Sequence, residues 1–115
     1  MKRLFIEAKW FTVELAECKS LGLLENIQAL ILEDPERGDL IQGTGGVRKL
    51  RAADPSRGKG KRGGYRILYL DLPDRDHTHL LLLYDKGSAD NITADEKRAI
   101  KALVDQIKAG KRLGT

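Results

Sequence analysis

Three basic residues stand on either side of a glycine-rich stretch, in segments with the alternating pattern of β-strands. Lys49 and Arg51 belong to VRKLRA (47–52), and Arg66 belongs to YRILYLD (65–71). Side chains two apart on a strand share one face, so Lys49 and Arg51 project together. If the two strands pair as a hairpin, Arg66 can join them on that face. Ammonium and guanidinium groups held by rigid strands suit the charge of a phosphodiester.

The same region contains most of the chain's excess positive charge. The formal net charge of the 115 residues is +4, yet residues 47–66 contain eight cations and one anion, Asp54. The eight cations are Arg48, Lys49, Arg51, Arg57, Lys59, Lys61, Arg62 and Arg66. The rest of the chain is therefore slightly acidic. A concentrated basic segment on an acidic body is typical of a protein that binds a polyanion, although a merely solvated run of charge is the alternative.

Other motifs in the chain do not support a phosphate loop, a metal site or a cofactor. The segment GTGGVR lacks the third glycine of a dinucleotide fingerprint and precedes a predicted strand, and GKGKRGG lacks the Lys-Ser or Lys-Thr pair of a Walker loop. His77 and His79 could form half of a metal site together with Asp74 and Asp76. A catalytic metal usually takes about three protein ligands, so we expect exposed histidines, no metal and no cofactor.

Length and composition indicate one domain, spanning residues 1–115. No apolar run is long enough to cross a membrane, and Glu7 and Lys9 interrupt the N-terminal apolar stretch before a signal peptide could form. The lone Cys18 has no second thiol to pair with, which fits a reducing compartment. We therefore expect a cytoplasmic protein with no membrane partner.

The elements that must position the basic residues follow from hydrophobic spacing. We expect a strand over KRLFIE (2–7), a short helix over residues 11–19, and a second helix that begins after an N-cap at Ser20 and ends before Pro35. The strands VRKLRA and YRILYLD follow. HTHLLLLYDK (77–86), with four consecutive leucines, predicts a central strand covered on both faces.

A final helix begins at the capping box formed by Thr93 and Glu96 and ends near Gly110. The order β-α-α-β-β-β-α predicts an α+β fold, with a helical hairpin against a mainly antiparallel four-stranded sheet. Tyr65, Tyr69 and Tyr84 are candidates for base stacking. Strand alternation places Tyr65 and Tyr69 on the face opposite Arg66, which favours a core or rim position for both.

These residues resemble a known family. The string IQGTGGVRKLR, a lysine- and glycine-rich loop, and then GGYRILYL are similar to the HigB branch of the RelE/ParE superfamily of bacterial toxin–antitoxin toxins. The likeness covers nearly the whole chain and implies the RelE fold. It also implies an mRNA interferase that cuts translated mRNA in the ribosomal A site without a metal: the ribose 2′-hydroxyl attacks the neighbouring phosphate, leaving a cyclic phosphate and a 5′-hydroxyl.

The resemblance also assigns roles to residues. Arg66 matches the arginine of the family's Gly-Tyr-Arg element and would stabilise charge on the phosphate oxygens. Lys49 and Arg51 match paired basic positions, Lys49 being the candidate for proton transfer, and Lys86 matches a basic position at the site rim. Residues implied to bind RNA or the ribosome are Arg48, Arg57, Lys59, Lys61 and Arg62. An antitoxin with a helix-turn-helix DNA-binding domain is the expected protein partner.

One departure leaves alternatives open. RelE places a catalytic tyrosine after its last strand, whereas this chain reads DKGSADNIT there, so the general base is not identified. Members of the superfamily that resemble ParE act on DNA gyrase instead of mRNA. A non-nuclease toxin acting on gyrase, or a basic regulator that binds nucleic acid, is therefore the alternative function.

Overall fold

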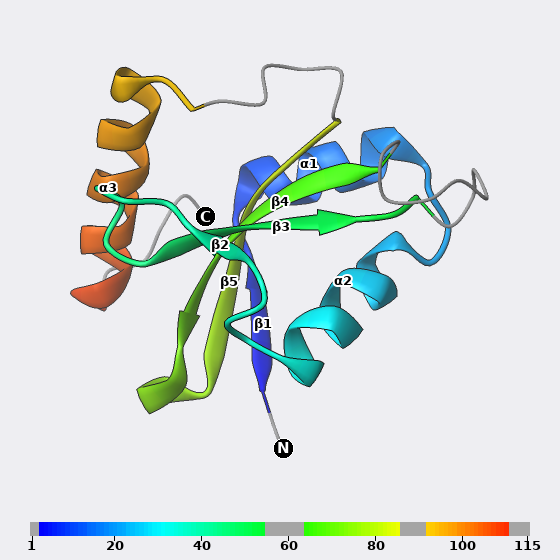
Figure 1. Ribbon diagram of the computed structural model, residues 1–115, viewed down its shortest axis with the longest axis horizontal. Helices are drawn as coiled ribbons and strands as arrows, with labels where there is room; N and C mark the ends of the chain where they lie inside the picture. Colours follow the sequence, from blue (N-terminus) through cyan, green and yellow to red (C-terminus); the bar gives the residue numbers. More distant parts are fainter. Residues whose placement is uncertain (1–2, 55–63, 86–91, 111–115) are drawn as a thin grey trace.

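The computed structural model describes residues 3–54, 64–85 and 92–110. Its strands are β1 (Leu4–Glu7), β2 (Asp39–Leu40), β3 (Val47–Ala52), β4 (Tyr65–Leu72) and β5 (His77–Asp85), and its helices are α1 (Lys9–Cys18), α2 (Leu23–Glu33) and α3 (Ala94–Lys108). A short 3-10 helix, η3 (Pro73–Arg75), joins β4 to β5. Figure 1 shows the α1–α2 pair and α3 on different sides of the sheet.

The sheet has the strand order β1-β5-β4-β3-β2. All neighbouring strands are antiparallel except β1, which runs parallel to β5. The predicted α+β class is confirmed, as is a mainly antiparallel sheet. The structure has one strand more than the sequence predicted, because the two residues of β2 pair with Lys49 and Arg48 of β3. A two-residue strand leaves no periodicity for a sequence pattern to detect.

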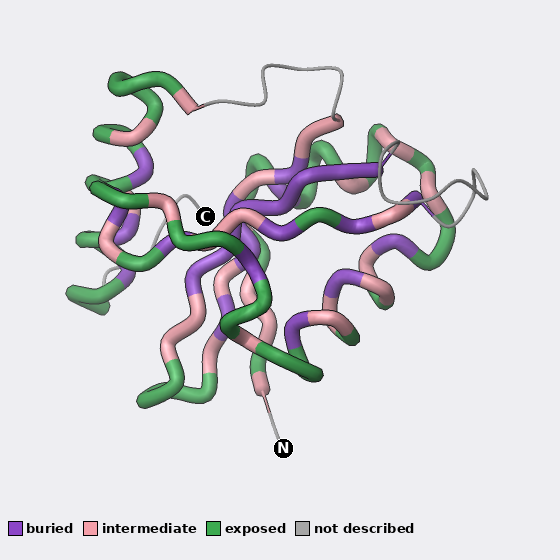
Figure 2. The backbone as a smooth tube through the Cα atoms, viewed as in Figure 1, coloured by how far each residue is buried: buried purple, intermediate pink, exposed green. Residues whose placement is uncertain are grey.

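The helical hairpin covers one face of the sheet and forms the larger core. Phe11 of α1 and Ile27 and Ile31 of α2 are fully buried against residues such as Ile67 and Tyr69 of β4. Figure 2 shows the buried residues concentrated in the sheet and on the helix surfaces that face it. The inward position of Tyr65 and Tyr69, expected from strand alternation, is confirmed.

The predicted N-cap of the second helix is wrong. The helix begins at Leu23 after Gly22, whose φ of 81° is a left-handed conformation that glycine adopts without steric cost. The Ser20 hydroxyl does not cap the helix and instead donates to Asp54 Oδ1 at 2.5 Å. The Ser20 hydroxyl therefore bonds to a carboxylate that is distant in the sequence and does not form the N-cap that the local sequence predicts.

On the other face, α3 packs Ile100, Val104 and Ile107 against Val47, Leu68 and Leu70. Its predicted capping box is confirmed: Thr93 Oγ1 accepts from the Glu96 N–H at 3.1 Å, and Glu96 Oε1 accepts from the Thr93 N–H at 2.9 Å. The hydrogen bond from the Thr93 backbone lowers the pKa of Glu96. The helix start is thereby fixed locally, which explains why the sequence identified it.

The leucines of β5 are covered on both sides, as predicted, but they do not alternate strictly. A register shift between β4 and β5 occurs at Leu68 and Tyr69. Leu80 and Leu83 join the core under the hairpin, while Leu81 and Leu82 both pack on the α3 side. An extra residue in one strand shifts the alternation in this way.

No helix within residues 3–54, 64–85 and 92–110 is both long enough and apolar enough to span a bilayer.

Candidate nucleic-acid interface

The pairing of β3 with β4 brings Lys49, Arg51 and Arg66 to one face of the sheet. Arg51 lies directly opposite Arg66 in the antiparallel register, and Lys49 lies opposite Leu68. Since residues opposite one another share a face, as do residues two apart, all three side chains are on the α3 side. The hairpin that the sequence required for this arrangement is present.

The three cationic side chains differ in accessibility. Arg51 is exposed and Lys49 is half-buried, whereas Arg66 is only 2% exposed. Like charges directly opposite on neighbouring strands destabilise a sheet, and burying a guanidinium adds a desolvation cost. Natural proteins retain such local costs mainly at functional sites, so this face is a candidate site.

A small hollow lies beside the outer edge of β3, where β2 has ended. It has a volume of about 330 Å³, and its wall includes Lys49 and Arg51 of β3 and Asn26 and Leu30 of α2. Arg37 and Asp39 complete its charged lining. The hollow therefore places a third cation next to Lys49 and Arg51.

Arg37 was not singled out from the sequence. It lies in the turn after α2, where its Nε donates to Leu30 O at 3.3 Å and its guanidinium pairs with Glu33 at 3.1 Å. The segment PERGD predicts a turn, but nothing local indicates that this turn folds back beside β3. Only the β2–β3 pairing supplies that information.

Arg48 does not share the face of Lys49 and Arg51. Its register partner is Tyr69, on the hairpin side of the sheet. The Arg48 guanidinium donates to Gly38 O at 2.9 Å and to Glu36 O at 3.2 Å. In this structure Arg48 holds the turn between α2 and β2 to the sheet.

Five other predicted site residues lie outside the described residues. They are Arg57, Lys59, Lys61, Arg62 and Lys86. The first four lie in the connection from β3 to β4, and Lys86 directly follows β5.

Gly64 explains why the chain can enter β4 so close to β3. A Cβ at this position would lie 2.1 Å from Ala52 O and 2.9 Å from Ala52 C. No side chain fits at such distances without separating the strands. Gly64 therefore permits the close approach that sets the register of Arg66 opposite Arg51, two residues later.

Tyr84 is brought to the same face by the β4–β5 pairing, in which it lies directly opposite Arg66. It is half-buried and contacts the core under α3. The sequence singled out Tyr84 as a stacking candidate but gave no reason to connect it with Arg66. That connection depends on the register, which the irregularity in β5 shifts.

The histidines lie at the other end of β5. His77 and His79 are opposite Leu72 and Leu70, whereas Arg66 is opposite Tyr84, so several residues of strand separate them from Arg66. Their ring centroids are 6.2 Å apart, and burial lowers the pKa of His79, with His77 and Arg75 adding to the effect. In the part of the chain that the structure describes, no group of three potential ligands could hold a metal.

The fold can be compared with that of a known toxin. The isolated RelE toxin of E. coli superposes with a TM-score of 0.57 over 89% of this chain and 99% of that chain. This chain has a RelE-like fold. The sequence identity is 14%, so the comparison establishes the architecture alone. No protein-family model matches the chain.

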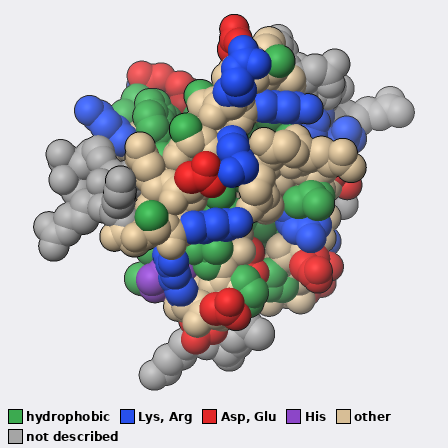
Figure 3. Space-filling model, turned by 90° about the vertical axis from the view of Figure 1, so that its left-hand side faces the viewer, with side chains coloured by type: hydrophobic (Ala, Val, Ile, Leu, Met, Phe, Trp, Pro, Cys, Tyr) green, Lys and Arg blue, Asp and Glu red, His purple; other side chains and the backbone are tan. Residues whose placement is uncertain are grey.

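The outer surface of α3 carries charges of both signs, unlike the face of Lys49, Arg51 and Arg66. Figure 3 shows Lys and Arg side chains on this side of the molecule with Asp and Glu side chains among them. Arg98 pairs with Asp95, and Lys101 pairs with Asp105 at 2.6 Å. Pairs of this kind between exposed residues contribute little and describe a solvated helix surface.

Proposed function

We propose that this chain is a HigB-type toxin of a toxin–antitoxin system and that it cleaves translated mRNA in the ribosomal A site. The observation that carries this proposal is the register that places Arg51 opposite Arg66, with Lys49 on the same face. The RelE-like fold supports it, because a solved protein with this architecture is described as a toxin.

The proposed reaction needs groups that position a phosphate and move protons. The ribose 2′-hydroxyl attacks the adjacent phosphorus, its proton passes to a general base, and the bond from phosphorus to the 5′-oxygen breaks. The 5′-oxygen takes up a proton, leaving a 2′,3′-cyclic phosphate and a 5′-hydroxyl. Negative charge develops on the phosphate oxygens during the attack, where fixed cations contribute most.

In our proposal each of the three cations, Lys49, Arg51 and Arg66, has a different role. Arg51 is exposed and would contact the phosphate first, and Lys49 would serve in proton transfer. Arg66, at 2% exposure, would stabilise the charge that develops in the transition state. A direct contact between Arg66 and phosphate requires the surrounding residues to move, so binding of RNA and uncovering of Arg66 are coupled.

Tyr84 is a second candidate for proton transfer because it lies opposite Arg66 on the neighbouring strand. The position of the histidines, at the far end of β5, argues against a role for either ring in moving the proton. A phenolic hydroxyl can both donate and accept a proton, and Tyr84 lies across from Arg66 in the register.

The remaining basic residues would contribute affinity. Arg57, Lys59, Lys61 and Arg62, in the β3–β4 connection, would contact ribosomal RNA, and Lys86 would lie at the rim of the site. Electrostatic contacts of this kind dominate binding to RNA and weaken with salt. A helix-turn-helix antitoxin is the proposed protein partner, and the proposed location is the cytoplasm.

The proposal can be tested with purified protein, programmed ribosomes and end-labelled mRNA. We expect cleavage within the A-site codon and a cyclic phosphate at the new 3′ end. Arg51→Ala should slow cleavage about 100-fold, which corresponds to the loss of one stabilising contact in the transition state. Arg98→Ala is the matched control, because it removes an arginine from the outer surface of α3 and should leave the rate unchanged.

A ParE-like toxin acting on DNA gyrase is the second candidate. It is favoured by the sequence after β5, which has no tyrosine before α3, and by the distance of the histidines from Arg66 along β5. In that case the same protein should leave mRNA intact on programmed ribosomes and inhibit DNA supercoiling by gyrase.

A further inference from the structure

Half of β5 has no strand beside it on the β1 side. β1 pairs with β5 only as far as Glu7 opposite Leu80, and the Ala8 N–H donates to Leu80 O at 2.9 Å where the chain turns into α1. Among the described strands, none pairs with Leu81–Asp85 on that side. These five residues form an edge, although β5 as a whole lies inside the sheet.

A groove of about 790 Å³ runs along this edge. Five consecutive residues of β5, Leu81–Asp85, line it. Leu82 lies on the α3 side of the sheet and Leu83 lies on the side of the helical hairpin. A groove that contacts both residues lies along the side of the strand, where its backbone groups are.

Both helical layers form the walls of this groove. Trp10 and Val13 of α1 line one wall, and Ile100 and Leu103 of α3 line the other. Trp10 is 55% exposed and Val13 is 46% exposed, so the wall made by α1 presents large apolar side chains to solvent. An open strand edge between two apolar walls matches the requirements for adding a strand with apolar side chains on both faces.

The charges on the groove indicate what the ends of such a strand should carry. Its lining includes the carboxylates Glu14, Asp85 and Glu96 and a single cation, Lys9. This acidic rim contrasts with the cationic face of Lys49, Arg51 and Arg66, which is formed by β3 and β4. The groove is therefore complementary to a segment with an apolar centre and basic ends, and unsuited to a nucleic acid.

We propose that the groove binds an extended peptide segment of a partner protein, which adds to β5 as a strand beside Leu81–Asp85. Main-chain hydrogen bonds to the open edge provide affinity, the apolar walls accept side chains from both faces of the added strand, and Glu14 and Glu96 select Lys or Arg at its ends. The inference rests on the strand edge and the groove, and it holds whichever function the cationic face performs.

Trp10 offers a direct readout, because it is the chain's single tryptophan and lines the groove. The probe is the synthetic peptide KKVIVIVKK, whose central residues are apolar on both faces of a strand, titrated into the full chain while tryptophan emission is recorded. We expect a saturable blue shift as the added strand covers the indole. The same peptide with N-methyl groups on alternate central residues cannot donate main-chain hydrogen bonds along one edge, and it should bind at least 10-fold more weakly.

Two variants separate the groove from the rest of the surface. Val13→Lys places a cation in the groove at an exposed position and should weaken binding of the basic peptide at least 10-fold. Leu21→Lys makes the same change in charge at an 88% exposed leucine in the α1–α2 turn and should leave binding unchanged. Thermal melts of both variants check that the fold is retained.

The proposal is overturned if no saturable shift occurs at millimolar peptide, or if the N-methylated peptide binds as well as its parent. The second result would mean that the groove holds an apolar segment without strand pairing, as for a helix. Sedimentation of the protein alone tests a second copy as the occupant: a dimer that excludes the peptide would also overturn it.

Discussion

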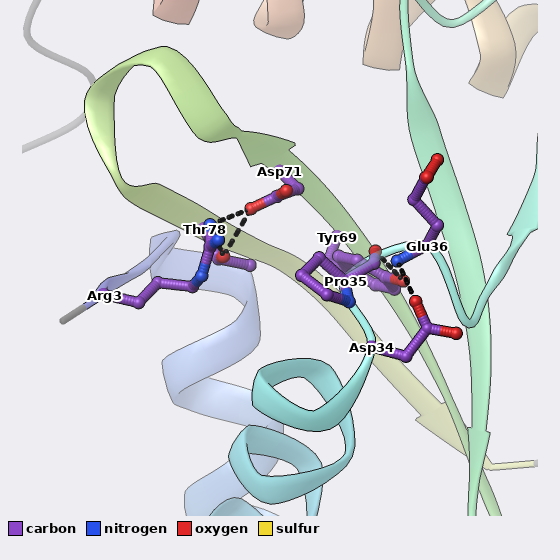
Figure 4. A network of polar contacts seen from close by, with 7 residues as sticks. All are labelled: Arg3, Asp34, Pro35, Glu36, Tyr69, Asp71 and Thr78. Atoms are coloured by element: carbon purple, nitrogen blue, oxygen red, sulfur yellow. Dashed lines mark hydrogen bonds and ion pairs between the residues drawn. The ribbon is translucent and has the colours of Figure 1, made fainter. Parts of the chain in front are cut away.

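At the scale of single residues, the Tyr69 hydroxyl ties the turn after α2 to the centre of the sheet. It donates to Pro35 O at 2.8 Å and accepts from the Gly38 N–H at 3.0 Å, as the close view in Figure 4 illustrates for Pro35. Burial raises the pKa of Tyr69 above its ordinary value of 10.0. The hydroxyl therefore stays protonated and able to donate at neutral pH.

Removing this hydroxyl should be costly. Tyr69→Phe leaves the ring in place but deprives the buried Gly38 N–H and Pro35 carbonyl of their partner, so we expect the free energy of unfolding to fall by about 1–3 kcal/mol. Urea denaturation followed by circular dichroism measures this difference. A loss below about 0.3 kcal/mol would show that water replaces the hydroxyl.

His79 should make the stability of the protein depend on pH near neutrality. Its folded pKa lies below the ordinary value of 6.5, first because of burial and then because of His77 and Arg75. As the pH falls through about 6.5, the unfolded chain takes up the proton before the folded chain does. The stabilisation is therefore complete above that pH and is lost progressively below it.

The measurement is the melting temperature between pH 7.5 and pH 5.5, a window above the range in which most carboxylates titrate. Wild type should lose stability across the window, and His79→Gln, which has no titrating ring, should lose less. Equal slopes for the two proteins would contradict a lowered pKa for His79.

At the scale of elements, the β3–β4 hairpin depends on Gly64. A Cβ there would lie 2.1 Å from Ala52 O, so Gly64→Ala must push apart the strands that carry Arg51 and Arg66. We expect a cost of about 1–3 kcal/mol from the steric conflict. We also expect loss of the proposed mRNA cleavage, because that activity depends on Arg51 lying opposite Arg66.

Gly43→Ala is the comparison for Gly64→Ala. A methyl group on Gly43 would meet no atom within 4 Å, but the φ of Gly43 is +82°, so a substitution there strains the backbone without separating β3 from β4. Its stability cost should come without the loss of activity. If Gly64→Ala melts as the wild type does, the close approach at Ala52 is not required.

Elements that are determined by residues close together in the sequence could be predicted. The strand VRKLRA matches β3 residue for residue, and the capping box fixes the start of α3. Features that depend on distant partners were not. Ser20 donates to Asp54, which is 34 residues away, and β2 exists only because β3 lies beside it.

The candidate site divides in the same way. Alternation predicted that Lys49 and Arg51 share a face, and the hairpin added Arg66 to it. The sequence could not predict that Arg66 is almost completely buried, that Arg37 joins Lys49 beside β3, or that Tyr84 lies opposite Arg66. Each of these follows from packing or from register across strands, which one-dimensional periodicity does not contain.

At the scale of the whole molecule, one sheet presents two different surfaces. β3 and β4 carry the cations proposed to engage RNA, and the open half of β5 forms an apolar groove with an acidic rim. Tyr84 belongs to both, since it lies opposite Arg66 and lines the groove. A peptide bound along β5 would therefore contact a neighbour of the proposed catalytic residues.

The most direct test of the proposed function is to map new 5′ ends on cellular mRNA after brief induction of the protein, beside Arg66→Ala and Arg66→Lys. We predict cuts at in-frame positions within translated regions, lost in Arg66→Ala, with both variants shown to be folded by their melting curves. Growth arrest with no new 5′ ends, or unchanged cutting by a folded Arg66→Ala protein, would contradict the proposal.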